Sequence, residues 1–210
     1  MTKIHPLYRI TIPKAHVPDF AKMIGCIDQN AKGIYDVLSA HGVKFETSYK
    51  EDHDALRQDV VFEARVSKDD RYHSIFDDDS DTMKAIIHYG EGVLLLEDGD
   101  YNLHNEAIIF YGADRPEIFP TRVALDFDED INVRALETIR TNRLNGRIWQ
   151  YGIARADSVP NHLNSEDLHR SDMSLPQVMG WMADSKDEGS EHMWRAVRRP
   201  VSITWESFEV

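Results

Sequence analysis

Three aspartates at alternate positions, Asp126, Asp128 and Asp130, are the residues of this chain best placed for chemistry. They end an apolar run, residues 123–125, that is typical of a strand. Alternate side chains of a strand share one face, so a strand continuing to residue 130 would present three carboxylates together. Oxygen ligands of this kind suit Mg²⁺ or Mn²⁺. The spacing therefore predicts a candidate divalent-cation site at Asp126, Asp128 and Asp130.

An apolar strand that ends in Asp-x-Asp resembles the metal-binding strand of archaeo-eukaryotic-type primases and other phosphoryl-transfer enzymes. The resemblance covers residues 123–130 and implies metal-dependent phosphoryl transfer. The small-residue–His motif that such primases place downstream has no counterpart here, nor does a basic nucleotide-binding patch. A calcium-binding loop fits less well, because Ile131 stands where that loop needs glycine for its sharp turn.

The same acids have a simpler structural interpretation. Asp128, Glu129 and Asp130 immediately precede a predicted helix over residues 132–144. Acidic side chains at this position accept hydrogen bonds from free backbone amides and oppose the positive end of the helix dipole. Because short motifs often match by chance, we expect helix capping ahead of metal binding.

Negative charge is concentrated in the middle of the chain. Residues 51–130 hold 22 Asp and Glu against 7 Lys and Arg, within a total net charge of −13. Such a region repels nucleic acid and anionic membranes and attracts cations or basic protein surfaces. The acids that we expect to contact a partner are Asp77, Asp78, Asp79, Asp81, Asp98 and Asp100. The structural alternative is that these acids simply form a solvated surface.

Other catalytic patterns are missing from the sequence. The pair His162 and His169 matches no zinc motif, and no Gly-x-Ser-x-Gly or phosphate-binding glycine loop is present. Cys26 lies beside an apolar helical stripe, which favours a small core residue over a reactive thiol. We therefore assign no catalytic residue and expect no cofactor beyond the divalent cation of the alternative above.

The hydrophobic pattern predicts an α+β fold with one mixed, mostly antiparallel sheet. Its opening is β-α-β-β, with strands over residues 7–12, 43–49 and 58–66 and an amphipathic helix over residues 20–38 that Gly42 stops. Further elements follow in the order helix, three strands, helix and strand. They are predicted over residues 81–88, 92–97, 106–111, 121–127, 132–144 and 147–153.

Residues 1–210 are expected to form a single domain, with residues 155–210 as a possible subregion because the composition changes there. Residues 157–172 are polar and predict a long loop, and short helices are predicted near residues 175–183 and 191–197. The tryptophans and methionines of this part have helical spacing, which favours a place in the core. Beside Arg195, Arg198 and Arg199 such residues would also suit a protein interface. They are Met179, Trp181, Met182, Met193, Trp194 and Trp205.

Three features bear on location. The longest aliphatic run, residues 93–96, is far shorter than the ~20 residues of a membrane span. The N-terminal residues lack the apolar stretch of a signal peptide. A lone cysteine, Cys26, cannot form an internal disulfide, which fits a reducing compartment. The sequence therefore predicts a cytoplasmic protein without a membrane segment.

Segregated charge without catalytic machinery favours a non-catalytic acidic protein that binds a basic protein surface and no nucleic acid directly. In its sharpest form it mimics nucleic acid and inhibits a basic nucleic-acid enzyme, as small phage-borne inhibitors of host defence do. Two alternatives stay open: a Mg²⁺- or Mn²⁺-dependent phosphoryl-transfer enzyme, and a structural or assembly protein. The sequence indicates neither the partner's identity nor the oligomeric state.

Overall fold

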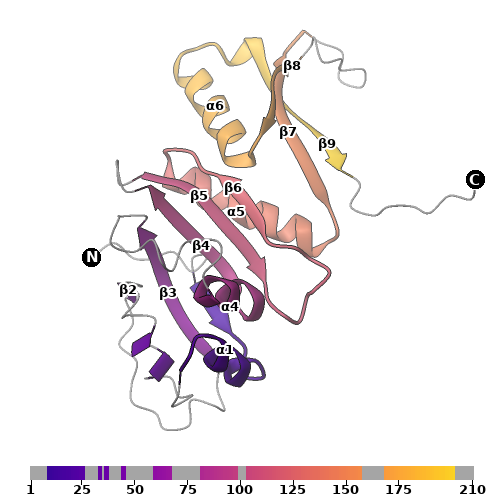
Figure 1. Cartoon of the computed structure of the whole chain (residues 1–210). Coiled ribbons are helices and arrows are strands. Elements are labelled where there is room, and N and C mark those ends of the chain that lie inside the picture. Colours follow the sequence, from indigo (N-terminus) through magenta and orange to yellow (C-terminus); the bar gives the residue numbers. More distant parts are fainter. Residues whose placement is uncertain are drawn as a thin grey trace, which may run out of the picture. The chain divides into compact units, whose positions relative to one another are not determined.

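The computed structural model of the chain contains both helices and strands. The described residues are 9–26, 33–34, 36–37, 44–45, 59–67, 81–98, 103–157 and 168–201. The chain divides into two compact units, Met1–Val123 and Ala124–Val210 (Figure 1). The single domain that the sequence predicts, with its subregion from residue 155, stays a prediction.

The α+β fold class is confirmed, but the described strands form two sheets instead of the single sheet that the sequence predicts. The first unit holds the larger sheet, with helices on it. Its elements are β1 (Arg9–Ile12), α1 (Val17–Met23), β2 (Lys44–Phe45), β3 (Val60–Ser67), α4 (Asp81–Tyr89), β4 (Glu91–Asp98), β5 (Leu103–Tyr111) and β6 (Thr121–Ala124). The six strands follow the order β2-β3-β1-β4-β5-β6. Neighbouring strands whose register is defined run antiparallel, and β3 and β4 also pair in parallel.

The four residues of β1 separate two longer strands. All four residues of β1 pair with β3 on one side, and Thr11 pairs with Glu91 of β4 on the other. Beyond β1 the two long strands meet directly, with Arg65 opposite Leu95. Gly92 of β4 permits the close approach of β1, because a Cβ there would overlap the carbonyl oxygen of Arg9, and its φ of +149° is one that side chains rarely adopt.

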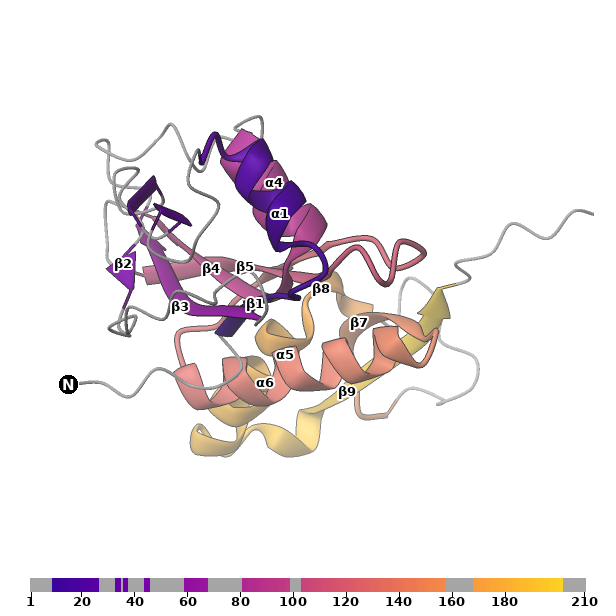
Figure 2. The same ribbon diagram turned by 90° about the horizontal axis from the view of Figure 1, so that it is seen from below.

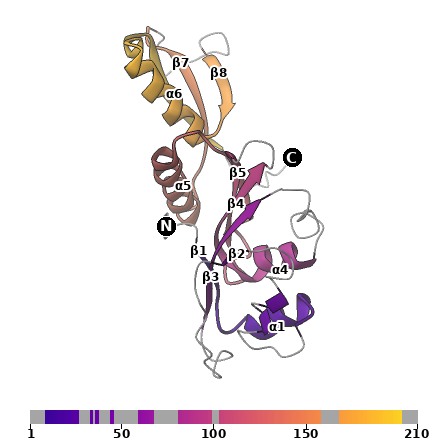
Figure 3. The ribbon, with the colours of Figure 1, turned by 90° about the vertical axis from the view of Figure 1, so that its left-hand side faces the viewer.

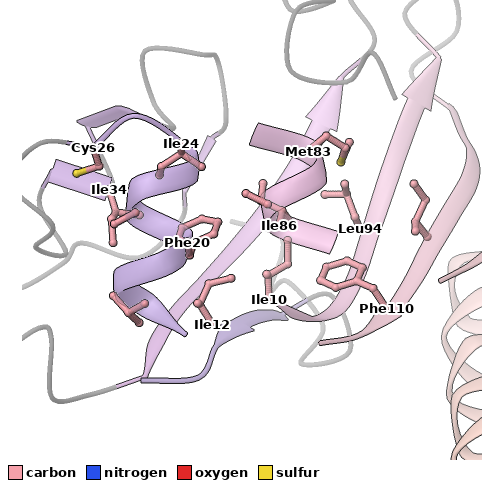
Figure 4. Close-up of a cluster of buried hydrophobic side chains, with 14 residues drawn as sticks. Ile10, Ile12, Phe20, Ile24, Cys26, Ile34, Met83, Ile86, Leu94 and Phe110 are labelled. Atoms are coloured by element: carbon pink, nitrogen blue, oxygen red, sulfur yellow. The ribbon is translucent and has the colours of Figure 1, made fainter. Parts of the chain in front are cut away.

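One hydrophobic cluster fills the space between this sheet and its helices. Helices α1 and α4 contact one another and lie side by side over one sheet face (Figures 2 and 3). The cluster joins side chains from β1, α1, α4, β4 and β5 (Figure 4). Its largest fully buried members include Ile10, Ile12, Phe20, Met83, Ile86, Leu94 and Phe110. Cys26 is 5% exposed and belongs to the same cluster, as the sequence predicts.

The first helix is shorter than its apolar stripe suggests. We predicted one helix over residues 20–38, but α1 ends at Met23 and Gly25 turns the chain with a φ of +73°. The amide of Cys26 then donates to the carbonyl of Ala21, which closes the helix end. The apolar periodicity suggested one continuous helix because Phe20, Ile24 and Ile34 are all buried in the core. They reach that core from separate segments of the chain.

The second unit packs two helices against a small antiparallel sheet. Its elements are α5 (Glu129–Leu144), β7 (Ile148–Arg155), β8 (Leu168–Met173), α6 (Leu175–Asp187), a 3₁₀ turn η3 (Glu191–Met193) and β9 (Trp194–Val201). The strand order is β8-β7-β9. Helix α6 contacts α5, β7 and β9. A capping box at Ser174 and Gln177 starts α6, and the Ser174 hydroxyl also donates to the carbonyl of Ala124 at 2.5 Å.

Two predictions in this unit are wrong. Residues 168–173 belong to strand β8 instead of a loop, while residues 158–167 lie outside the described part of the chain. The helix expected over residues 191–197 is a single 3₁₀ turn followed by β9. Both strands are rich in polar and charged residues, so neither shows the alternation that marks a half-buried strand. Their pairing with β7 overrides the local pattern.

No helix of the described residues combines the length and the apolar character that crossing a bilayer would require.

The contact at Gly92 predicts a specific loss of stability. Gly92→Ala should lower the free energy of unfolding by about 2 kcal/mol or more, because its Cβ would push β1 away from β4. The control is Gly25→Ala, where φ is also positive but an added Cβ would meet no atom of a non-neighbouring residue within 4 Å. The expected loss in the free energy of unfolding is therefore only about 1 kcal/mol. Urea unfolding measures both, and equal losses would contradict the proposed crowding.

Candidate functional site

Only two of the six acids predicted to contact a partner lie among the described residues. Asp81 is the first residue of α4 and is exposed. Asp98 is the last residue of β4. Four of them lie outside the described residues, namely Asp77, Asp78, Asp79 and Asp100. Whether these six acids form one contact surface therefore stays a prediction.

A different set of acids gathers where several strands of the six-stranded sheet begin or end. Asp59 directly precedes β3, and Glu91 is the first residue of β4. Strand β1 joins the two, since Ile12 pairs with Val60 and Thr11 with Glu91. Both carboxylates therefore lie at the same end of the sheet.

Two further acids follow β5 at this end. Glu91 also pairs with Tyr111, the last residue of β5, and the next loop carries Asp114 and Glu117. The loop is closed by hydrogen bonds from the amide of Arg115 to Gly112 and from that of Ile118 to Arg115. We call the group Asp59, Glu91, Asp114 and Glu117 the acidic sheet end.

Contacts with the turn after β1 position two of these carboxylates. The amide of Lys14 donates to Asp59 Oδ1 at 3.0 Å. The Nε2 of His16 lies 3.0 Å from Asp114 Oδ1, with side-chain exposures of 21% and 72%. Glu91 and Glu117 are exposed. The acidic sheet end therefore retains negative charge that is open to solvent.

The three aspartates of the candidate metal site lie at a corner instead of along a strand. Strand β6 ends at Ala124, so the shared strand face that we expected does not form. Asp128 is the N-cap of α5, and its Oδ1 accepts from the amides of Asp130 at 2.8 Å and Ile131 at 3.1 Å. Helix capping, the structural interpretation, is thus seen directly at Asp128.

Asp126 also has structural partners. Its amide and carbonyl are both bonded by the Asn132 side chain, each at 2.8 Å, and its Oδ1 accepts from the amide of Asp128 at 3.1 Å. Its carboxylate lies against α6, because a Cβ at Gly180 would overlap it. Among the described residues no three His, Cys, Asp or Glu side chains are grouped to hold a metal ion. Metal binding by these aspartates stays a prediction.

Capping and metal binding make different predictions for Asp128. Asp128→Ala should lower the free energy of unfolding by about 1 kcal/mol with or without Mg²⁺, because the cap bonds are lost. Asp128→Ser should retain most of the stability, since serine also caps. Asp130→Ala is the control and should cost only a few tenths of a kcal/mol, roughly a helix-dipole effect. A thermal melt that Mg²⁺ raises for the native chain and not for Asp128→Ser would instead support metal binding.

The sheet of the second unit carries an arginine and tryptophan surface, in a part of the chain where the sequence analysis favoured an ordinary core. Its strands β7, β8 and β9 hold five arginines and one acid. The Arg198 guanidinium lies 4.3 Å from the centroid of the Trp149 ring, and that of Arg170 lies 4.9 Å from Trp181. Each pair is within the range of a cation–π interaction.

A polar ladder crosses the same three strands. The Arg199 Nε donates to Gln150 Oε1 at 2.6 Å, and the Gln150 amide donates to Asp172 Oδ1. Gln150 pairs with Arg199 and Tyr151 with Arg198, so the two adjacent arginines take opposite faces of the sheet. Arg199 joins the ladder on one face of the sheet, and Arg198 lies on the other face, over the Trp149 ring.

Aromatic rings that we expected in the core are only half-buried here. The His169 ring lies 4.5 Å from Trp194 and 5.5 Å from Trp181, and the two indoles meet edge-on at 6.3 Å. Met193 is 50% exposed, and Trp205 lies outside the described residues. The sequence signal for this surface is the set of arginines Arg195, Arg198 and Arg199, which the helical spacing of the tryptophans and methionines outweighed in the prediction.

Tyr151 shows the effect of this environment on a titratable group. Burial raises the pKa of its phenol above the usual 10.0, while the Arg198 charge and a hydrogen bond with Asn142 partly offset the rise. The folded protein therefore favours the neutral phenol.

The raised pKa of Tyr151 predicts a loss of stability in alkali. The neutral phenol contributes stability that is complete below pH 10, its pKa in the unfolded chain. This stability is lost as the pH rises through the higher pKa of the folded protein. Tyr151→Phe has no phenol to ionise. Its free energy of unfolding should therefore fall less than that of the native chain between pH 9 and pH 11, which lie about one pH unit on either side of the unfolded pKa. Urea unfolding at the two pH values tests this, and parallel losses in both proteins would contradict it.

Comparisons with protein-family models, curated proteins and solved structures gave no match to this chain.

Proposed function

We propose that this chain is a non-catalytic binding protein that contacts a basic protein surface through its acidic region, residues 51–130. The supporting observation is the exposure of the acids in this region. Of those whose burial is described none is buried, and only Glu106 and Asp126 are half-buried. Carboxylates at the surface are free to meet a cationic partner, whereas buried ones would be committed to the fold.

The acidic sheet end is the part of this region whose geometry fits the proposal best. Its carboxylates come from separate segments but are held by one framework of paired strands. A rigid arrangement of charge loses little entropy on binding. In the sharpest form of the proposal these carboxylates substitute for phosphates in the groove of a nucleic-acid enzyme, where neutralised charge provides much of the affinity.

A pair of variants with equal net charge tests the proposal. One variant removes three charges of the acidic sheet end (Asp59→Asn, Glu91→Gln and Glu117→Gln). The control removes three exposed charges of the second unit (Asp184→Asn, Asp187→Asn and Glu188→Gln). A third variant changes Asp77, Asp78 and Asp79 to Asn. Each immobilised protein is challenged with host lysate at low salt and eluted with a salt gradient, and bound proteins are identified by mass spectrometry.

We expect a basic protein to bind the native chain and the control, and to bind the sheet-end variant about tenfold more weakly, a difference of ~1.4 kcal/mol. Its retention should fall with salt, as for exposed charges. Displacement of that partner by duplex DNA would support mimicry. If the sheet-end variant retains the partner as well as the control does, the acidic sheet end is not the contact. Absence of any basic partner would contradict the whole proposal.

A further inference from the structure

A pocket opens beside the acidic sheet end of the first unit. It lies between α4 and the loop that follows β5, and its volume is about 360 Å³. Among the described residues its apolar and aromatic walls come from Ile87, Tyr111, Pro116, Ile118, Phe119 and Pro120. The Phe119 side chain is 72% exposed. An exposed apolar patch with polar residues around it is typical of an interaction site.

The loop that forms one side of this pocket has a fixed shape. Two hydrogen bonds between its own backbone groups close it, as described above. The contact between His16 and Asp114 attaches it to the turn after β1. Pro116 and Pro120 fix the φ angle at two of its positions. Because the wall is already ordered, a group that enters the pocket binds at a small entropic cost.

The same loop joins the pocket to the acidic sheet end. Asp114 and Glu117 lie in it among residues that line the pocket, and Tyr111 of the pocket wall pairs with Glu91. In protein interfaces charged groups mainly speed and orient the encounter. Most of the binding energy comes from a few apolar or aromatic side chains buried in pockets. A protein that meets these carboxylates is therefore well placed to cover the pocket as well.

Charges at the pocket itself indicate which group enters it. Lys84 and Arg115 belong to its lining, and both are exposed. A lysine or arginine of a basic partner is repelled by these two side chains and attracted by the carboxylates beside them. An uncharged apolar side chain meets no such repulsion, and its burial removes apolar surface from water. The pocket therefore favours an apolar group, whereas the acidic sheet end favours cations.

From these features we propose that the basic partner inserts one bulky apolar side chain, such as tryptophan, into this pocket. Its lysines and arginines contact the acidic sheet end at the same time. This inference rests on the proposed function and adds a second property of the same partner, an apolar side chain that projects from a basic surface. A partner held by charge alone would leave the pocket open and Phe119 exposed.

Peptide binding, measured by fluorescence anisotropy, tests this inference. One probe is a labelled lysine-rich peptide with a single central tryptophan, and the other carries alanine in its place. The proteins are the native chain, Phe119→Ala and the sheet-end variant. The matched control is Phe127→Ala, because Phe127 is 88% exposed and does not line the pocket. Unchanged thermal melts show that each variant is folded.

We expect the native chain to bind the tryptophan peptide about tenfold more tightly than the alanine peptide. Phe119→Ala should remove most of this difference without weakening the alanine peptide, and Phe127→Ala should leave the difference intact. Both affinities should fall when the salt concentration rises from about 0.01 M to about 0.1 M, but their ratio should not change. Salt screens the charges that both peptides share and not the apolar contact.

Two results would each overturn the inference: equal affinity of the two peptides for the native chain, or equal effects of Phe119→Ala and Phe127→Ala. Either result leaves the proposed function standing if the sheet-end variant binds the alanine peptide more weakly than the native chain does. If the sheet-end variant binds that peptide as tightly as the native chain, the proposed function fails. Absence of binding by both peptides up to about 1 mM would overturn the two together.

Discussion

The close packing of β1 between β3 and β4 is the constraint on which the first unit depends. Ile10 and Ile12 are both completely buried and link the sheet to α1 and α4. A strand of four residues provides few backbone hydrogen bonds, so its position relies on these two side chains and on the space above Gly92. The same pairing brings Asp59 and Glu91 to one end of the sheet. The acidic sheet end is thus a consequence of how the core is assembled.

In the second unit the corresponding constraint is the corner from Ala124 to Asn132. The Asn132 side chain closes it by bonding both the amide and the carbonyl of Asp126, and Asp128 then starts α5. Ser174 attaches the start of α6 to the same corner through the Ala124 carbonyl. Acidic residues here satisfy backbone donors that would otherwise be unpaired, which is a structural use for a motif that also suits metal ions.

Sequence patterns were sufficient where burial imposes a clear period. Helix α4 and strands β4 and β5 lie close to their predicted bounds, because their apolar residues line one core. Strand β3 also lies close to its predicted bounds. The failures occur where pairing overrides local pattern: β8 and β9 are polar strands, and α1 stops at Gly25 although the apolar stripe continues. At the candidate sites, capping by Asp128 could be predicted from its place before a helix. The acidic sheet end could not, since strand register brings Asp59, Glu91 and Asp114 together from distant positions.

An acidic surface and an arginine-rich surface can coexist in one chain because electrostatic fields in salt water are short-ranged. At physiological ionic strength the screening length is about 8 Å, so a ligand responds mainly to the charges nearest to it. In the small sheet those charges are arginines, and at least two of them rest on tryptophan rings, which hold a guanidinium without neutralising it. The net charge of −13 therefore does not by itself decide the sign of the charge that a ligand meets at this sheet.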